Sequence, residues 1–223
     1  MAAPRALVFD WDNTLVDSWA IIHEALVLTF TAMDHVPWTL DETKARVRHS
    51  LREAFPKLFG ERWEDARKLY LDHFTAIHLA KMAPLAGARE LLEGVNAAGF
   101  YSGVLSNKTG RILRREVEHL GWGSYFARLV GAGDASADKP DPIAMAAVLE
   151  GSGFAGADVW YVGDTALDME CAARAGCVGV LLGEADAADQ GFAQFPPGLR
   201  FASIAELARA LTAAADPSSS GTR

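Results

Sequence analysis

Two aspartates at the end of a short apolar segment are the residues of this chain best suited to chemistry. Residues 6–9 are apolar and have the length of a buried strand; Asp10 and Asp12 follow it, and Thr14 lies just behind. Charged side chains are rarely placed beside a core strand without a partner. Two carboxylates at one strand end can do different work on one substrate: one attacks or binds a metal, and the other moves a proton.

Later apolar segments also end in polar residues. Ser106 and Asn107 follow residues 101–105 and precede a helical pattern, which suits either a phosphate site or an ordinary helix cap. Lys139 lies after residues 129–133 and just before another helix start. A cation is unfavourable at that end of a helix unless an anion lies between them, so the lysine indicates an anion site. The alternative is a solvated loop lysine.

Two further carboxylates, Asp164 and Asp168, follow the apolar residues 159–162 at a strand-to-helix turn. A helix cap with a surface aspartate behind it is the alternative explanation, although it does not account for the apolar surroundings of Asp164. Together with Asp10 and Asp12, they would place four carboxylates at one sheet edge, where they repel one another unless a cation neutralises them. Hard oxygen ligands suit Mg²⁺. The sequence therefore predicts a magnesium site.

These segments, taken in order, resemble the four motifs of the haloacid dehalogenase superfamily, in its phosphatase branch. The matching residues are Asp10-x-Asp12-x-Thr14, Ser106, Lys139-Pro140 and Gly163-Asp164-x-x-x-Asp168. One position departs from the family pattern, because Asn13 stands where the family usually has glycine. Asparagine tolerates left-handed backbone conformations better than most residues, so we expect the turn to be kept.

The resemblance implies a reaction through an aspartyl phosphate. Asp10 would be the nucleophile, and Asp12 would protonate the leaving oxygen and then deprotonate the hydrolytic water. Mg²⁺ would be held by the Asp10 side chain, the Asp12 backbone carbonyl and Asp164. Lys139 would be the catalytic cation.

The resemblance also implies a phosphate-binding group and two supporting residues. Ser106, Asn107 and Lys139 would hold the phosphoryl oxygens. Thr14 and Asp168 would lie behind them, with Asp168 orienting either the metal site or Lys139.

The resemblance narrows the substrate only to a class of small phosphorylated metabolites. The Ser-Asn-Lys segment at 106–108 and the segment 50–56 are similar to phosphoglycolate phosphatases and their near relatives. A small phosphorylated metabolite such as 2-phosphoglycolate would need a cation for its carboxylate, and Arg48 and Arg52 are candidates. The alternative for each arginine is an exposed position on a helix.

Two other classes of function stay open. A phosphomutase of the same superfamily would use the same nucleophile and return the phosphoryl group to a sugar phosphate. A ligand-binding protein on the same fold would need no catalysis, although such proteins normally lack a motif residue. A haloacid dehalogenase proper is disfavoured, because carbon–halogen cleavage in this family does not use the proton shuttle that Asp12 would provide.

Strand-length apolar runs alternate with helical patterns, which predicts an α/β fold with a doubly wound parallel sheet. Only helical signals occur between residues 18 and 81. We therefore expect a core of residues 1–16 and 84–215 and an inserted helical cap of residues 17–83. The Ser- and Gly-rich residues 216–223 are expected to be a disordered tail.

The composition narrows the function further. The formal net charge is −8 and half of the residues are hydrophobic, with no basic stripe of the kind that nucleic-acid binding requires. We interpret the helical pattern with Arg111–Arg115, Glu116 and Glu118 as a solvated face. Cys171 and Cys177 suit a reducing compartment. With no signal peptide and no apolar run of ~20 residues, we expect a cytoplasmic monomer or homodimer that binds neither nucleic acid nor membrane.

Overall fold

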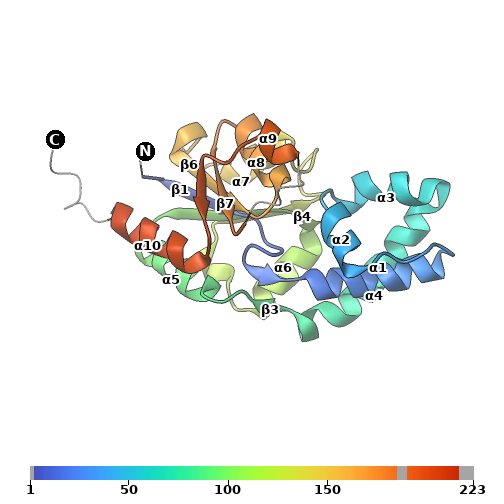
Figure 1. Cartoon of the computed structure of the whole chain (residues 1–223). Helices are drawn as coiled ribbons and strands as arrows, with labels where there is room; N and C mark the ends of the chain where they lie inside the picture. Colours follow the sequence, from blue (N-terminus) through green and yellow to red (C-terminus); the bar gives the residue numbers. More distant parts are fainter. Residues whose placement is uncertain (1–2, 185–189, 216–223) are drawn as a thin grey trace.

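A computed structural model describes residues 3–184 and 190–215. Its centre is a six-stranded sheet in the order β5-β4-β1-β6-β7-β8, in which every neighbouring pair is parallel (Figure 1). The predicted doubly wound parallel sheet is confirmed. The strands are β1 (Ala6–Phe9), β4 (Tyr101–Thr109), β5 (Arg128–Ala132), β6 (Val159–Gly163), β7 (Val178–Leu182) and β8 (Leu199–Phe201).

Both faces of the sheet are covered, which explains why its strands read as continuous apolar runs. On β1, Leu7 and Phe9 face one hydrophobic cluster, and Ala6 and Val8 face another. The first cluster is completed by α5 (Ala88–Ala97), α6 (Gly110–His119) and α10 (Ile204–Ala215). The second is completed by α7 (Pro142–Leu149) and α8 (Ala166–Arg174).

The strand order reverses beside β1, because the chain continues from β1 to β4 on one side and later returns to β6 on the other. In open α/β sheets, ligands bind at the carboxyl ends of the strands next to such a reversal. A ligand site is therefore expected at the loops after β1 and β6. These loops hold Asp10 and Asp164.

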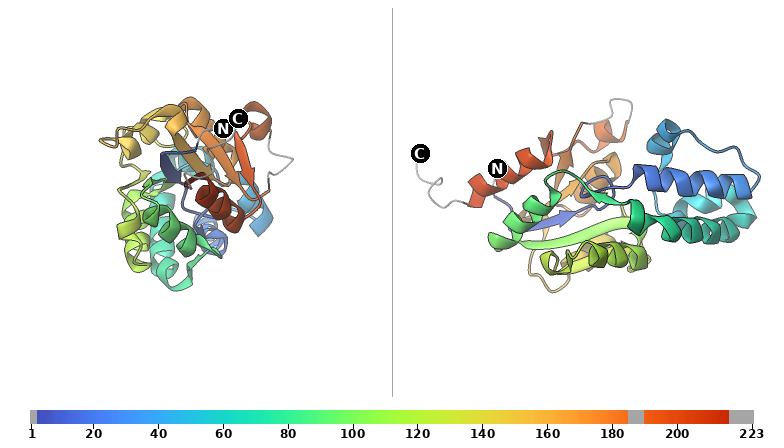
Figure 2. Two further views of the ribbon diagram at one scale, coloured as in Figure 1. Left: turned by 90° about the vertical axis from the view of Figure 1, so that its left-hand side faces the viewer. Right: turned by 90° about the horizontal axis from the view of Figure 1, so that it is seen from below.

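Between β1 and β4 the chain forms a group of helices with a hydrophobic cluster of its own. Phe30, Phe55 and Phe74 lie in that cluster, and Ile112 of α6 joins it to the sheet domain. The group lies beyond one end of the sheet in Figure 1 and in the right-hand view of Figure 2. Its helices are α1 (Trp19–Ala32), α2 (Leu40–Arg46), α3 (Leu51–Phe59) and α4 (Trp63–Lys81). We refer to α1–α4 as the helical insertion.

A small antiparallel ribbon of β2 (Val16–Asp17) and β3 (Ala83–Pro84) connects the insertion to the sheet. A capping box begins α2, since Thr39 and Glu42 exchange side-chain to backbone hydrogen bonds of 3.2 and 2.9 Å. The remaining short elements are η1 (Gly60–Arg62), η2 (Gly123–Tyr125), η3 (Gly156–Asp158) and α9 (Gly191–Gln194).

Two boundaries differ from those that the sequence pattern alone indicates. The amphipathic pattern of the last helix extends back to Phe201, but Phe201 belongs to β8, where its backbone pairs with Leu182 of β7. Residues 106–109 continue strand β4, although the polar sequence suggested a loop. The predicted tail, residues 216–223, lies outside the described residues. No helix among residues 3–184 and 190–215 has the length and apolar character needed to cross a membrane.

Candidate active site

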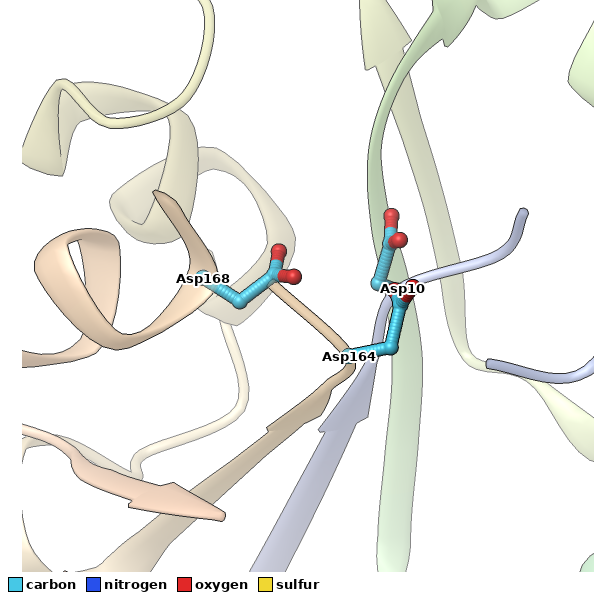
Figure 3. Close-up of side chains that lie close together, drawn as sticks. All are labelled: Asp10, Asp164 and Asp168. Carbon is cyan, nitrogen blue, oxygen red and sulfur yellow. The ribbon is translucent and has the colours of Figure 1, made fainter. Parts of the chain in front are cut away.

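Three carboxylates meet at the carboxyl end of β1 and β6. Asp10 follows β1, Asp164 follows β6, and Asp168 lies in the first turn of α8. One oxygen of each lies within 4.8 Å of the others, and Figure 3 shows the side chains converging on one region. The convergence follows from the register, because Phe9 pairs with Val162 and the neighbouring strands β1 and β6 end within one residue of each other, at Phe9 and Gly163.

Lys139 lies between two of these carboxylates. Its Nζ is 2.7 Å from Asp10 Oδ1 and 2.8 Å from Asp168 Oδ1, and its side chain is 4% exposed. Asp168 also accepts hydrogen bonds from the Tyr161 hydroxyl at 3.0 Å and from the Thr165 hydroxyl at 2.6 Å. Both alternatives, a solvated loop lysine and a surface aspartate, are wrong, because both side chains are buried.

The electrostatics divide the cluster into two parts. Burial raises the pKa of Asp168, but Lys139 and the hydrogen bonds from Thr165 lower it more, so the net pKa is below its usual value. Burial lowers the pKa of Lys139, and the two neighbouring carboxylates raise it above its usual value. Lys139 and Asp168 therefore form a charged, buried pair.

Asp10 and Asp164 form the other part, where negative charge is in excess because Asp10 shares Lys139 with Asp168. Burial raises the pKa of Asp10 to about 7, although Lys139 opposes the shift. Burial, followed by the charges of Asp168 and Asp10, raises the pKa of Asp164 well above its usual value. A divalent cation would offset this repulsion between carboxylates, and carboxylate oxygens are the donors that Mg²⁺ prefers. The residues present fit such an ion; Asp168, which accepts hydrogen bonds from Tyr161 and Thr165 as well as from Lys139, fits a supporting position.

The turn after β1 places Asp12 and Thr14 on the same site. Asn13 has φ of 62°, a left-handed conformation, so the expectation that asparagine would keep this turn is confirmed. The Thr14 hydroxyl donates to Asp164 Oδ1 at 3.1 Å. The Asn13 side chain accepts a hydrogen bond from the Ser18 backbone at 3.2 Å, which holds the start of the insertion against the turn.

Ser106 and Asn107 line the same cavity as Asp10 and Asp164. The cap alternative is wrong for both, because α6 begins after Thr109 and has no side-chain cap hydrogen bond. The Asn107 amide donates to the Lys139 backbone carbonyl at 3.2 Å. Its buried Oδ1 has no hydrogen-bond partner among the residues that the structure describes.

The two arginine candidates differ. Arg52 forms two hydrogen bonds of 2.5 and 2.6 Å with Asp138, whose side chain is 1% exposed, so its guanidinium is already engaged by a carboxylate of the core. Arg48 lies in the cavity wall and donates to backbone carbonyls of Lys44 and Val47. Of the two, only Arg48 lines the cavity.

The cavity itself lies between the carboxylates and the helical insertion. Its polar floor consists of Asp10, Asp12, Asp164, Ser106, Asn107, Lys108 and Lys139. The opposite wall is mainly apolar and aromatic, with Trp19, Ile22, Leu51, Tyr70 and Phe74 from the insertion. A phosphate group would fit the floor, and the rest of a substrate would contact the insertion.

Sequence reasoning missed Lys108 and Glu116. Lys108 Nζ lies 2.6 Å from Asp12 Oδ1 and 2.6 Å from Glu116 Oε2. Glu116 was expected on a solvated helix face, but its side chain is 1% exposed. A signal was available: Ile112, Leu113, Glu116 and Val117 have the spacing of one helical face, and all four are buried.

One family model and several individual proteins are similar to this chain over most of its length. The sequence model of the haloacid dehalogenase-like hydrolases matches residues 7–181. A phosphoglycolate phosphatase from Rhodospirillum rubrum is 31% identical over 189 residues, covering 78% of this chain and 77% of its own. A phosphoglycolate phosphatase from Xylella fastidiosa (strain 9a5c) is 28% identical over 179 residues, covering 78% of each chain.

Solved structures share the fold at lower identity. A haloacid dehalogenase-like family hydrolase from Streptococcus pneumoniae superimposes with a TM-score of 0.81 at 18% identity, covering 93% of this chain and 98% of its own. A hydrolase of the same superfamily from Ehrlichia chaffeensis gives a TM-score of 0.65 at 24% identity, covering 97% and 100%. The likeness extends over the sheet and the helical insertion alike.

Proposed function

The chain belongs to the haloacid dehalogenase-like hydrolases, and on that premise we propose that it is a Mg²⁺-dependent phosphatase of small phosphate monoesters. The observation that carries the proposal is the division of charge at the sheet edge. Lys139 is shared between Asp10 and Asp168, so the three carboxylates of Asp10, Asp164 and Asp168 outnumber the lysine that contacts them. This arrangement suits a nucleophilic carboxylate, a metal and an anionic substrate in one place.

Asp10 is the nucleophile in this proposal. One of its oxygens attacks phosphorus, the bond from phosphorus to the ester oxygen breaks, and Asp12 gives its proton to that oxygen. Water then attacks the aspartyl phosphate, Asp12 takes the water proton, and Asp10 is released. When bound by Asp10, Asp164 and the Asp12 carbonyl, Mg²⁺ would offset the repulsion between the carboxylate and the phosphoryl group.

Ser106, Asn107 and Lys139 are the proposed phosphate-binding residues. Lys139 brings a fixed positive charge, and Ser106 and Asn107 bring a hydroxyl and an amide at the end of the cavity floor. Donors held in place before the reaction stabilise charge on the equatorial oxygens without reorganisation. The hydrogen bond of 3.2 Å from the Asn107 amide to the Lys139 backbone carbonyl supports placing these two residues in one binding group.

The helical insertion is the proposed cap, comprising residues 17–83 over a core of 1–16 and 84–215. Its own hydrophobic cluster and its place across the cavity from the carboxylates support this assignment. Closure of the insertion would exclude water from the transfer step. The names of the relatives suggest 2-phosphoglycolate as a substrate, and Arg48 is the cation of the insertion that lines the cavity.

Phosphate release tests the proposed function. We expect the purified protein to release phosphate from a panel of small monoesters, including 2-phosphoglycolate, with Mg²⁺ but not with EDTA. Asp10→Asn should reduce turnover to background while the circular dichroism spectrum is kept, because an amide of the same shape cannot attack phosphorus. A wild-type protein that releases no phosphate from any ester with Mg²⁺ would contradict the proposal.

A further inference from the structure

We propose that Lys108 and Glu116 are positioning residues for Asp12, and that His78 ties them to the helical insertion. The inference rests on the proposed function, because it assigns Asp12 the proton transfer described above. The four residues come from three places in the chain: the turn after β1, the end of β4 with α6, and α4 of the insertion. They form one buried chain of contacts.

Lys108 holds the Asp12 side chain from one side. Its Nζ lies 2.6 Å from Asp12 Oδ1, and the lysine side chain is 5% exposed, so water does not compete for this contact. The approach is an ion pair without the alignment of a hydrogen bond. An ammonium group has no acceptor, so Oδ1 cannot direct a proton toward it. The other carboxylate oxygen, Oδ2, is therefore the one that can carry a proton to a substrate.

Glu116 contacts both Lys108, which is the ion-pair partner of Asp12, and Trp11, which precedes Asp12 in the chain. One oxygen, Oε2, lies 2.6 Å from Lys108 Nζ and also accepts a hydrogen bond of 2.7 Å from the Trp11 indole. Trp11 is the chain neighbour of Asp12 and is fully buried. Glu116 thus restrains Asp12 twice, through its ion-pair partner and through the residue that precedes it.

His78 connects this array to the insertion. Its Nδ1 lies 2.7 Å from Glu116 Oε1, and its side chain is fully buried. Lys108 also lies over the ring of Phe74, one turn earlier on α4, with Nζ 5.0 Å from the ring centre. The same helix supplies Tyr70 and Phe74 to the cavity wall. A substrate that contacts this wall therefore acts on the helix that fixes Asp12.

Stability alone does not explain the array. A buried ion pair is often no more stabilising than well-packed apolar residues of the same volume, because its desolvation offsets the attraction. Here the fold buries Lys108, Glu116 and His78 together beside Asp12. Defined geometry at the proton-transferring carboxylate is what such a network offers and an apolar cluster does not.

The dependence on the leaving group tests the positioning role. We would measure kcat/KM of the wild type, Lys108→Met and Glu116→Gln with Mg²⁺, on p-nitrophenyl phosphate and on alkyl phosphates. A poor leaving group needs its oxygen protonated, and help of this kind is worth about 10²–10⁴ in rate. We expect a loss of at least tenfold on alkyl phosphates and about threefold or less on p-nitrophenyl phosphate. Equal losses on both substrates, or no loss, would overturn the proposal.

Two further measurements separate positioning from a role in folding. Glu118→Gln is the matched control, because Glu118 is exposed on the same helix; its kinetics should equal those of the wild type. In an Asp12→Asn background, Lys108→Met should cause no further loss on alkyl phosphates, because both act through one carboxylate. An additive loss would show that Lys108 acts elsewhere. A wild type without phosphatase activity would reject the proposed function itself, whereas active variants with uniform losses would reject only the positioning role.

Discussion

At the scale of single residues, the site depends on how each charge is held. Lys139 contacts Asp10, the proposed nucleophile, and Asp168, which accepts three more hydrogen bonds from Tyr161 and Thr165. Asp168 cannot move without losing these bonds, so it fixes the position of the lysine. We propose that Asp168 supports the phosphate site by orienting Lys139, and that Asp10 and Asp164 hold the metal.

Removing the charge of Asp168 tests this proposal. Asp168→Asn should lower kcat by about 10–100-fold, the usual cost of losing a residue that orients a ligand group. The melting temperature should fall as well, because a buried ion pair loses one partner. Steady-state kinetics and a thermal melt measure both effects.

Glu170→Gln is the control for this variant. Glu170 pairs with Arg174 at 2.5 Å on the same helix, but the arginine side chain is 50% exposed, and such surface pairs are worth about 0–1 kcal/mol. Its kinetics and melting temperature should stay close to those of the wild type. Wild-type turnover in Asp168→Asn would show that Lys139 needs no such support.

At the scale of elements, the turn from β6 into α8 brings Asp164 and Asp168 into the site. The turn depends on Gly163, because a Cβ at this position would lie 2.4 Å from Cγ of Asp168. The Asp168 side chain packs directly against the glycine backbone, where a larger residue has no room. The glycine that precedes Asp164 is therefore required by close packing at the start of the helix.

Gly163→Ala should consequently displace Asp168 and, through it, Lys139. We expect turnover to fall by at least tenfold, comparable to the loss of a supporting residue of the site. Gly94→Ala in α5 is the control, because a Cβ there has no heavy atom within 4 Å and alanine favours helix over glycine by about 1 kcal/mol. That variant should be as active as the wild type. An active Gly163→Ala would show that Asp168 can shift without consequence.

The parts of the site that the sequence predicts are those set by local structure and strand order. Asp10 and Asp164 could be paired because both end neighbouring parallel strands, and the Asn13 turn follows from backbone preference. Glu116 was misplaced because it lies among charged residues, although its spacing with Ile112 and Leu113 put it on the buried face of the helix. The partner of Arg52 is 86 residues away, and no sequence pattern connects the two.

At the scale of the whole molecule, the negative charges of the buried carboxylates in the cavity oppose folding of the chain. The sheet brings Asp10 and Asp164 together at the strand ends, and the helical insertion covers them with an apolar wall. Burial of this kind favours the protonated form of a carboxylate. Protons or a bound metal would each offset the excess negative charge at this place, and the two would compete.

This competition predicts a pH-dependent stabilisation by Mg²⁺. The folded, metal-free protein keeps a proton on Asp10 up to a pKa of about 7, whereas the reference value is 3.8. Between these values the folded state binds more protons than the unfolded state, so this group's contribution to the free energy of unfolding falls as the pH rises. Mg²⁺ binds the deprotonated carboxylate and must displace that proton below neutral pH.

We therefore expect millimolar Mg²⁺ to raise the melting temperature more at about pH 8 than at about pH 6, with an apparent affinity about tenfold weaker at the lower pH. Asp164 acts in the same direction, because burial also raises its pKa. Thermal melts with a Mg²⁺ titration at both pH values measure the effect. Asp10→Asn is the control, since its amide holds no proton to displace, and its Mg²⁺ response should be small at both. An equal response of the wild type at both pH values would remove Asp10 from the metal site.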